Sequence, residues 1–280
     1  MTAEIPGYIH GYSDSEETRL IEQAGLLAPF VFGGLDYSAG GPLLELGCAV
    51  GAELKLMHRK WPRLELWGVD RAAGHLERAR RYLAPEIAAG QVNLVEADAA
   101  RLPFGDGRFG RVVTIWLLEH VPEPGRVIVE ALRVLKPGGE LVLTEVSNES
   151  LRFDPPVPEI AAWWDAFNRY QQQGGGDPFI GPKLEGFAKA AGAVDVRSEA
   201  LRMIDTRRDP GERRKWAVYL QALLLSAAPG MIAAGLVSEA DARLVRAAFT
   251  RVSSDSSVSF RYDATRLACR RASDFLQIAK

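Results

Sequence analysis

The chain has 280 residues, of which 47% are hydrophobic, and a formal net charge of −2 at pH 7. This length suits one large α/β domain with additions, or two small domains. The balanced charge gives no positive field for nucleic acid, and two cysteines are too few for a disulfide framework. Because neither a leader-like N-terminus nor a long apolar run is present, we expect a cytoplasmic protein without a membrane span.

Residues 1–41 are expected to form an N-terminal arm and a lid helix. Tyr8, His10 and Tyr12 lie beside Gly7 and Gly11, and the sequence Ser-Asp-Ser-Glu at 13–16 is a strong helix start. Flanking glycines would let the arm swing over a bound ligand. Arg19 on the helix would then bind a carboxylate of that ligand. The alternative is an ordinary packed arm with Arg19 on the surface.

A short apolar stretch at 43–46 leads into the turn Gly-Cys-Ala-Val-Gly at 47–51, and a helix follows. Gly47 and Gly51 allow a tight turn and a close approach of a ligand to the backbone. Their spacing differs from the Gly-x-Gly-x-x-Gly of dinucleotide-binding proteins. The pattern indicates the first strand and ligand-binding loop of a nucleotide-binding domain.

Further apolar strands are predicted at 64–70, 92–99, 111–116 and 140–146, separated by amphipathic helices. This alternation predicts a doubly wound, mostly parallel α/β sheet, in which ligands bind beyond the carboxyl ends of the strands. Asp70, Asp98, Trp116 and Glu145 all lie at predicted strand ends. Asp70 is placed for ribose hydroxyls, for capping the next helix, or for both.

Beyond residue 147 the alternation stops. An aromatic-rich helix near 163–170 and a glycine-rich loop at 174–181 precede a helix at 183–191 and strands near 194–204 and 258–269. Residues 42–208 and 251–280 are therefore predicted to form the sheet domain. The helical block 209–250 is interpreted as an insertion over the active site, with a dimerisation surface as the alternative.

Several motifs in order resemble those of class I S-adenosylmethionine-dependent methyltransferases. They are Glu-Leu-Gly-Cys-Ala-Val-Gly at 45–51, Asp70, Asp-Ala at 98–99 with Leu-Pro-Phe at 102–104, Glu-His-Val at 119–121 and Leu-Lys-Pro-Gly-Gly at 135–139. The resemblance covers about residues 40–146. It implies a seven-stranded Rossmann-like sheet ending in an antiparallel hairpin, S-adenosyl-L-methionine as cofactor and S-adenosyl-L-homocysteine as product.

The resemblance also implies roles for individual residues. Asp70 would bind both ribose hydroxyls, Arg71 would lie against the adenine, and Asp98 with the Ala99 N–H would bind its edge. The residues expected to contact the cofactor, lid residues included, are Tyr12, Arg19, Gly47, Cys48, Ala49, Gly51, Asp70, Arg71, Asp98, Ala99, Ile115 and Trp116. The backbone of the glycine turn would hold the methionine moiety.

The expected reaction is direct displacement at the sulfonium methyl, in which positioning matters most and some acceptors need a base. Glu145, Glu119 and His10 are the candidate catalytic groups, with His120 as a further candidate behind them. Glu145 is expected to face the pocket, or alternatively to act as a hydrogen-bonding or capping residue. His120 is expected to pack structurally, and His58 and His75 to lie on exposed helix faces. No metal site is predicted, since no ligand spacing occurs.

The acceptor is expected to be a small apolar or aromatic molecule, such as a natural-product or quinone-type metabolite. No nucleic-acid or membrane partner is expected, and a homodimer is left open. Two other functions compete, namely a nicotinamide-dependent dehydrogenase and a protein that binds S-adenosylmethionine without methyl transfer. Binding of each cofactor and turnover to S-adenosylhomocysteine separate the three.

Overall fold

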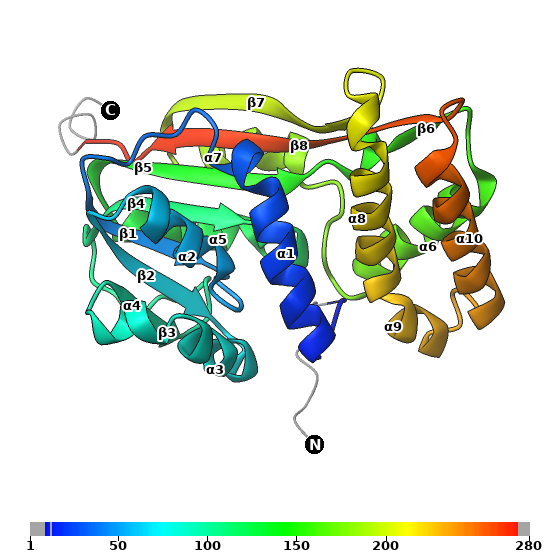
Figure 1. Ribbon diagram of the computed structural model, residues 1–280. Coiled ribbons are helices and arrows are strands. Elements are labelled where there is room, and N and C mark those ends of the chain that lie inside the picture. The colour runs from blue at the N-terminus through cyan, green and yellow to red at the C-terminus, as the bar shows by residue number, and fades with distance from the viewer. Residues whose placement is uncertain (1–8, 12, 274–280) are drawn as a thin grey trace.

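The computed structural model describes residues 9–11 and 13–273. They form one eight-stranded sheet in the order β3-β2-β1-β4-β5-β8-β6, with β7 also paired to β8 (Figure 1). The strands are β1 Gly41–Leu46, β2 Leu64–Asp70, β3 Val92–Glu96, β4 Phe109–Ile115, β5 Leu135–Val146, β6 Arg152–Asp154, β7 Val194–Asp205 and β8 Ser259–Arg270. β1 to β5 are mutually parallel, which confirms the predicted doubly wound sheet.

The predicted closing hairpin is present, because β7 and β8 pair antiparallel along most of their length. The sheet nevertheless has one strand more than the expected seven. β8 has 12 residues, and β5 pairs only with its part from Ala264 to Arg270. The short strand β6 pairs with the remaining part, from Ser259 to Arg261.

Helices cover both faces of the parallel sheet. The helices are α1 Asp14–Val31, α2 Ala52–Lys60, α3 Ala73–Tyr82, α4 Ala84–Ala88, α5 Pro124–Val134, α6 Pro158–Gln173, α7 Leu184–Ala190, α8 Arg213–Ser226, α9 Ala228–Ala233 and α10 Glu239–Ser254. Leu27 of α1 and Met57 of α2 belong to the apolar core on one face. Ile128 of α5 and Leu184 of α7 belong to the core on the other. None of the described helices is long and apolar enough to cross a membrane.

Four helices, α6, α8, α9 and α10, gather beyond the carboxyl ends of the parallel strands and form a cap (Figure 1). Within the cap, the buried indole of Trp163 on α6 donates a hydrogen bond to the Leu224 carbonyl of α8 at 2.8 Å. α6 lies outside the predicted insertion 209–250. It joins the cap because its apolar face packs on α8 and α10.

α1 is tied to the sheet at its C-terminal end. The last turn of this helix has no basic residue, but Arg266 of β8 reaches it. Its guanidinium donates to the carbonyl oxygens of Val31 at 3.3 Å and Gly33 at 2.6 Å, and pairs with Glu199 at 2.6 Å. A cation at a helix C-terminus satisfies carbonyls that have no partner within the helix.

We predict that Arg266→Met lowers the free energy of unfolding by about 1–3 kcal/mol, since buried carbonyls lose a charged donor. Urea titration measures this effect. Arg270→Met is the matched control, because Arg270 lies on the same strand, is exposed and donates to the Gly138 carbonyl. Equal losses in the two variants would contradict the proposed anchoring of α1.

Candidate functional site

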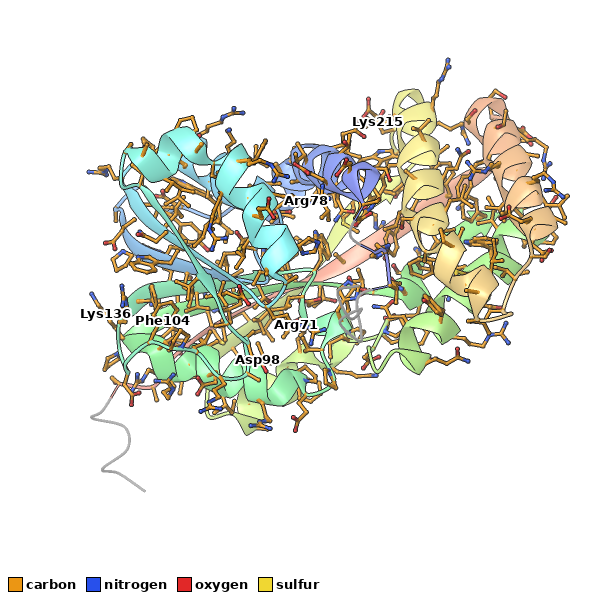
Figure 2. The ribbon with its side chains drawn as sticks, turned by 90° about the horizontal axis from the view of Figure 1, so that it is seen from below. Arg71, Arg78, Asp98, Phe104, Lys136 and Lys215 are labelled. Carbon is orange, nitrogen blue, oxygen red and sulfur yellow. The ribbon has the colours of Figure 1, made fainter. Side chains whose placement is uncertain are left out.

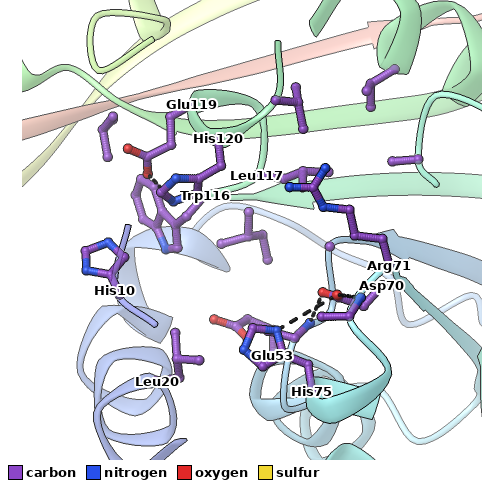
Figure 3. A pocket seen from close by; sticks show the side chains of 18 of the residues that line it. His10, Leu20, Glu53, Asp70, Arg71, His75, Trp116, Leu117, Glu119 and His120 are labelled. Atoms are coloured by element: carbon purple, nitrogen blue, oxygen red, sulfur yellow. Dashed lines mark hydrogen bonds and ion pairs between the residues drawn. The ribbon is translucent and has the colours of Figure 1, made fainter. Parts of the chain in front are cut away.

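A cavity of about 220 Å³ lies where the carboxyl ends of β1, β2, β4 and β5 meet α1 and the cap (Figure 3). Eleven of the fifteen predicted site residues line it. They are His10, Arg19, Gly47, Ala49, Asp70, Arg71, Asp98, Ala99, Ile115, Trp116 and Glu119. Three others, Cys48, Gly51 and Glu145, are not part of the lining, and Tyr12 lies outside the described residues.

The turn after β1 is held by bonds within the protein. The N–H groups of Gly47 and Cys48 donate to the Val69 carbonyl at 2.7 and 3.0 Å, and that of Gly51 donates to the Cys48 carbonyl at 2.7 Å. The Ala49 N–H donates to Asp70 at 2.9 Å. These four N–H groups therefore do not point at a ligand, in contrast to the expectation for the turn. Gly47 still matters, because a Cβ there would lie 2.7 Å from the Leu117 side chain.

Cys48 and Gly51 serve packing. Cys48 is 1% exposed, and its Sγ would lie 2.8 Å from a Cβ at Gly68. A Cβ at Gly51 would lie 2.5 Å from Leu83. Burial raises the pKa of the Cys48 thiol well above its ordinary value, which agrees with a small buried apolar role.

Asp70 lies at the end of β2, and both of its carboxylate oxygens accept backbone N–H groups. One carboxylate oxygen accepts the Ala49 N–H, and the other accepts the Ala72 N–H at 2.8 Å, at the start of α3. The same carboxylate lines the cavity. His75 of α3 approaches it at 3.9 Å. The expectation that His75 is exposed was wrong: the residue is 4% exposed and lines the cavity, because the first turn of α3 packs behind Asp70.

Arg71 and Asp98 are exposed residues at the cavity rim. Figure 2 shows them near one another in the middle of the molecule, at the carboxyl ends of β2 and β3. Asp98 accepts the Ala100 N–H at 2.8 Å, which shapes the short loop that also contains Ala99. This rim offers hydrogen-bonding groups from side chains and backbone.

The turn after β4 forms the centre of the cavity wall. Ile115 ends the strand, and Trp116 follows with φ +56°, a left-handed conformation that costs a non-glycine residue free energy. Leu118–His120 then form a single 3₁₀ turn. Trp116, Glu119 and His120 lie together in Figure 3, with His10 of the N-terminal arm facing them.

Glu145 has a different place from the one expected. It is fully buried and accepts the N–H groups of Leu117 at 3.1 Å, Leu118 at 2.8 Å and Glu119 at 3.3 Å. The carboxylate is therefore turned toward the backbone of the turn after β4, because these N–H groups have no strand partner. The hydrogen-bonding alternative describes Glu145, and the structure contradicts its placement in the pocket.

Glu119 is the buried carboxylate that does line the cavity. The Gln171 amide donates to its Oε2 at 2.7 Å, and His120 Nε2 lies 3.7 Å from its Oε1. Burial raises the pKa of Glu119 to about 7, although the Gln171 hydrogen bond and the charge of Arg19 act in the opposite direction. A carboxyl with such a pKa is suited to accept a proton near neutral pH. His120 also lines the cavity, which its expected structural role did not include.

His10 joins the N-terminal arm to the cap. Its Nδ1 lies 2.5 Å from Ser226 Oγ, and its ring meets the His120 ring edge-on at 5.8 Å. Burial, followed by the charges of Arg19 and His120, holds the pKa of His10 well below its ordinary value. Arg19 of α1 is bound to Glu16 at 2.6 Å and to Gln23 at 2.6 Å. It nevertheless lines the cavity, at 11% side-chain exposure.

Several lining residues were missed from the sequence. The cavity wall also includes Glu53 at the start of α2 and four residues from the cap and closing hairpin, Met203, Tyr219, Leu223 and Tyr262. Burial raises the pKa of Glu53 to about 7. The Tyr262 hydroxyl donates to Asn148 at 2.5 Å. Only the interpretation of 209–250 as a cover hinted at this set. In the described part of the chain, no three His, Cys, Asp or Glu residues gather as metal ligands.

We predict that Glu145 makes stability depend on pH. Burial and the charge of Glu119 raise the pKa of Glu145 from 4.5 to about 8 in the folded protein. The folded state therefore binds this proton more tightly. The resulting stabilisation is complete below the unfolded pKa and is lost as pH rises through the folded one. Between pH 4.5 and about 8, the melting temperature should fall less steeply with rising pH for Glu145→Gln than for the unmodified protein.

Glu140→Gln, on the same strand, is the matched control and should keep the original slope. An unchanged slope in Glu145→Gln would show that the buried carboxyl does not hold an additional proton.

Comparisons with known proteins match the part of the chain that contains the parallel strands. A family model described as a methyltransferase domain matches residues 44–143. A ubiquinone/menaquinone biosynthesis C-methyltransferase of Desulfotalea psychrophila is 35% identical over 120 residues, covering 43% of this chain and 44% of the relative. The 27-O-demethylrifamycin SV methyltransferase of Amycolatopsis mediterranei is 34% identical over 134 residues, covering 48% and 49%.

The chain thus spans less than half the length of these relatives. Among solved structures, phosphoethanolamine N-methyltransferase 2 of Haemonchus contortus in complex with phosphomonomethylethanolamine and S-adenosylhomocysteine has the same fold. Its TM-score is 0.58 at 17% identity, over 89% of this chain and 52% of that one. The chain therefore contains a class I S-adenosylmethionine-dependent methyltransferase domain.

Proposed function

We propose that this protein transfers the methyl group of S-adenosylmethionine to a small, largely apolar acceptor, with Glu119 as the proton acceptor. One observation carries the proposal. A single cavity has strand-end carboxylates on one side, aromatic and apolar cap residues on the other, and a buried carboxyl between them. The first side suits a ribose and an adenine, and the second suits the acceptor.

The cofactor side fits S-adenosylmethionine on features of this chain. Asp70 presents a carboxylate to the cavity, as two ribose hydroxyls require, and Gly47 keeps the wall low where a Cβ would meet Leu117. Glu45 Oε2, buried beneath the turn, has no hydrogen-bond partner within the described residues, and Glu53 lies nearby with a raised pKa. This acidic environment suits the ammonium group of the methionine moiety.

The remaining assignments follow the positions of the side chains. Asp98 and the Ala99 backbone would bind the adenine edge, and Arg71 would cover one face of the ring. Ile115 and Trp116 would lie near the sulfonium, and Arg19 would meet the carboxylate of the methionine moiety. When bound, S-adenosylmethionine supplies an electrophilic methyl group on a positively charged sulfur.

The acceptor side would hold a molecule without phosphate or carboxylate groups. Its walls are Met203, Tyr219, Leu223 and Tyr262, with Val146 at the base. Burial raises the pKa of both tyrosines, which therefore stay neutral. Such a chamber favours apolar or aromatic acceptors. The relatives named for quinone and rifamycin methylation support this class of acceptor.

The chemistry of the chain's own residues is then simple. The cap and the cavity walls exclude water and align the acceptor, a contribution of positioning that suits a donor which is already activated. Glu119 accepts the proton from a hydroxyl or an acidic carbon of the acceptor, while that oxygen or carbon attacks the methyl group.

We predict that Asp70→Asn weakens binding of S-adenosylhomocysteine by about tenfold or more, because hydrogen bonds to a charged group contribute about 1.5–3 kcal/mol. Asparagine keeps an acceptor for only one of the two N–H groups that Asp70 binds, so the melting temperature is measured as well, to separate a loss of stability from a loss of affinity. Isothermal titration calorimetry measures the affinity. Asp106→Asn is the control, since this exposed aspartate pairs with Arg133 away from the cavity. Unchanged affinity would remove Asp70 from the site.

Turnover is tested with a panel of apolar phenols and hydroxyquinones, by mass-spectrometric detection of S-adenosylhomocysteine and methylated product. We expect methyl transfer to at least one of them, and a loss of about 100-fold or more in kcat for Glu119→Gln with cofactor affinity kept. Binding of nicotinamide cofactors instead of S-adenosylmethionine would overturn the proposal. Cofactor binding without transfer to any acceptor would favour a binding protein.

A further inference from the structure

The glycine-rich segment after α6 and the last turn of that helix surround Glu119, and the proposed reaction gives them no task. We propose that Gln171, supported by Gly176 and Asp177, is a positioning residue that clamps the Glu119 carboxylate toward the acceptor. This proposal rests on the proposed role of Glu119 as proton acceptor. It adds a residue 52 positions away in the sequence.

Hydrogen bonds from this segment reach both the side chain and the backbone of Glu119. The Gln171 amide nitrogen donates to Glu119 Oε2 at 2.7 Å and to the Glu119 carbonyl oxygen at 3.1 Å. The Asp177 N–H donates to the same carbonyl at 2.8 Å. Three hydrogen bonds from one short segment thus fix the residue at two points.

The segment itself is rigidly shaped around this contact. A Cβ at Gly176 would overlap the Glu119 carbonyl oxygen, so glycine is needed for the close approach. The Gly176 N–H donates to the Gln171 carbonyl at 3.0 Å, which closes the chain back onto the end of α6. Asp177 accepts the Phe179 N–H at 3.0 Å and pairs with Lys183 at 2.6 Å, which fixes the far side of the turn.

The orientation of the amide decides which carboxylate oxygen remains for the acceptor. Oε2 accepts from Gln171, whereas Oε1 lies 3.7 Å from Nε2 of His120, which also lines the cavity. Gln171 is fully buried, and a hydrogen bond to a buried carboxylate both orients it and stabilises its charged form. A substitution that removes the amide should therefore disturb both the geometry and the pKa of Glu119.

Other charged and titratable groups also face Glu119 and stay constant in the test. Arg19 lowers its pKa from α1, and the negative charge of Glu119 itself raises the pKa of Glu145 on β5. The same charge raises the pKa of Tyr219 on α8 and Tyr262 on β8. Among the described residues, the groups that face Glu119 include Arg19, His120, Glu145, Tyr219 and Tyr262, with His10 in contact with His120.

The test replaces Gln171 by Leu and, to keep an unbranched side chain, by Met. Gln172→Leu is the matched control, because Gln172 is the exposed neighbour on the same helix. All variants are prepared with S-adenosylhomocysteine bound, and the Glu119 carboxyl carbon is titrated by ¹³C NMR, with Glu119→Gln used for assignment. Melting temperatures identify any variant that does not fold.

We expect the pKa of Glu119 to rise by about one pH unit or more in Gln171→Leu and Gln171→Met, and to stay unchanged in Gln172→Leu. With an acceptor from the panel, the acidic limb of kcat/KM should move to higher pH by the same amount. At neutral pH, kcat should fall by about tenfold or more, while the KM for S-adenosylmethionine is kept. A purely structural residue would change stability without moving the pH profile.

The outcomes separate the clamp from the proposed function. If methyl transfer occurs and neither the Glu119 pKa nor the pH profile moves in a folded Gln171 variant, the clamp is overturned and the function stands. If the Glu119 pKa moves but no acceptor is methylated, the hydrogen bond is supported and the proposed function fails.

Discussion

The site depends on the hydrogen bonds that the buried carboxyl group of Glu145 accepts. The turn after β4 leaves the plane of the sheet, so its N–H groups lose their strand partners. Glu145 accepts three of them, from Leu117, Leu118 and Glu119. A buried N–H without a partner costs about 1–3 kcal/mol. This one side chain therefore compensates for the conformation that places Glu119 at the cavity and holds Trp116 at a positive φ.

The sequence was sufficient for the sheet and for the cavity wall at the strand ends because those signals are local. An apolar strand followed by an acid or a glycine predicts where a strand ends, and the ends of parallel strands meet at one edge. Asp70 and Asp98 line the cavity for this reason. The same rule failed for Glu145. Its direction depends on the hydrogen-bonding needs of a turn on the neighbouring strand, which no local pattern shows.

The cavity wall formed by the cap and the closing hairpin was harder to predict, since it is assembled from distant segments. Tyr219 comes from α8 and Tyr262 from β8, and both meet the end of the central strands only in the folded chain. The sequence of α6 predicts an amphipathic helix, but no local sequence pattern indicates that Trp163 joins this helix to the cap. For His75, the helical pattern gave a face, but not the packing of that face behind Asp70.

The two walls of the cavity also come from different parts of the sequence. The N–H groups of the glycine turn are satisfied before any ligand binds, so discrimination on that side would come from the side chains of β2 and β3. All of these lie within residues 44–143, the part that matches the methyltransferase family. The chamber wall formed by Met203, Tyr219 and Tyr262 lies outside it. The part of the chain that matches the family and the wall that the cap and closing hairpin contribute are therefore separate in the sequence.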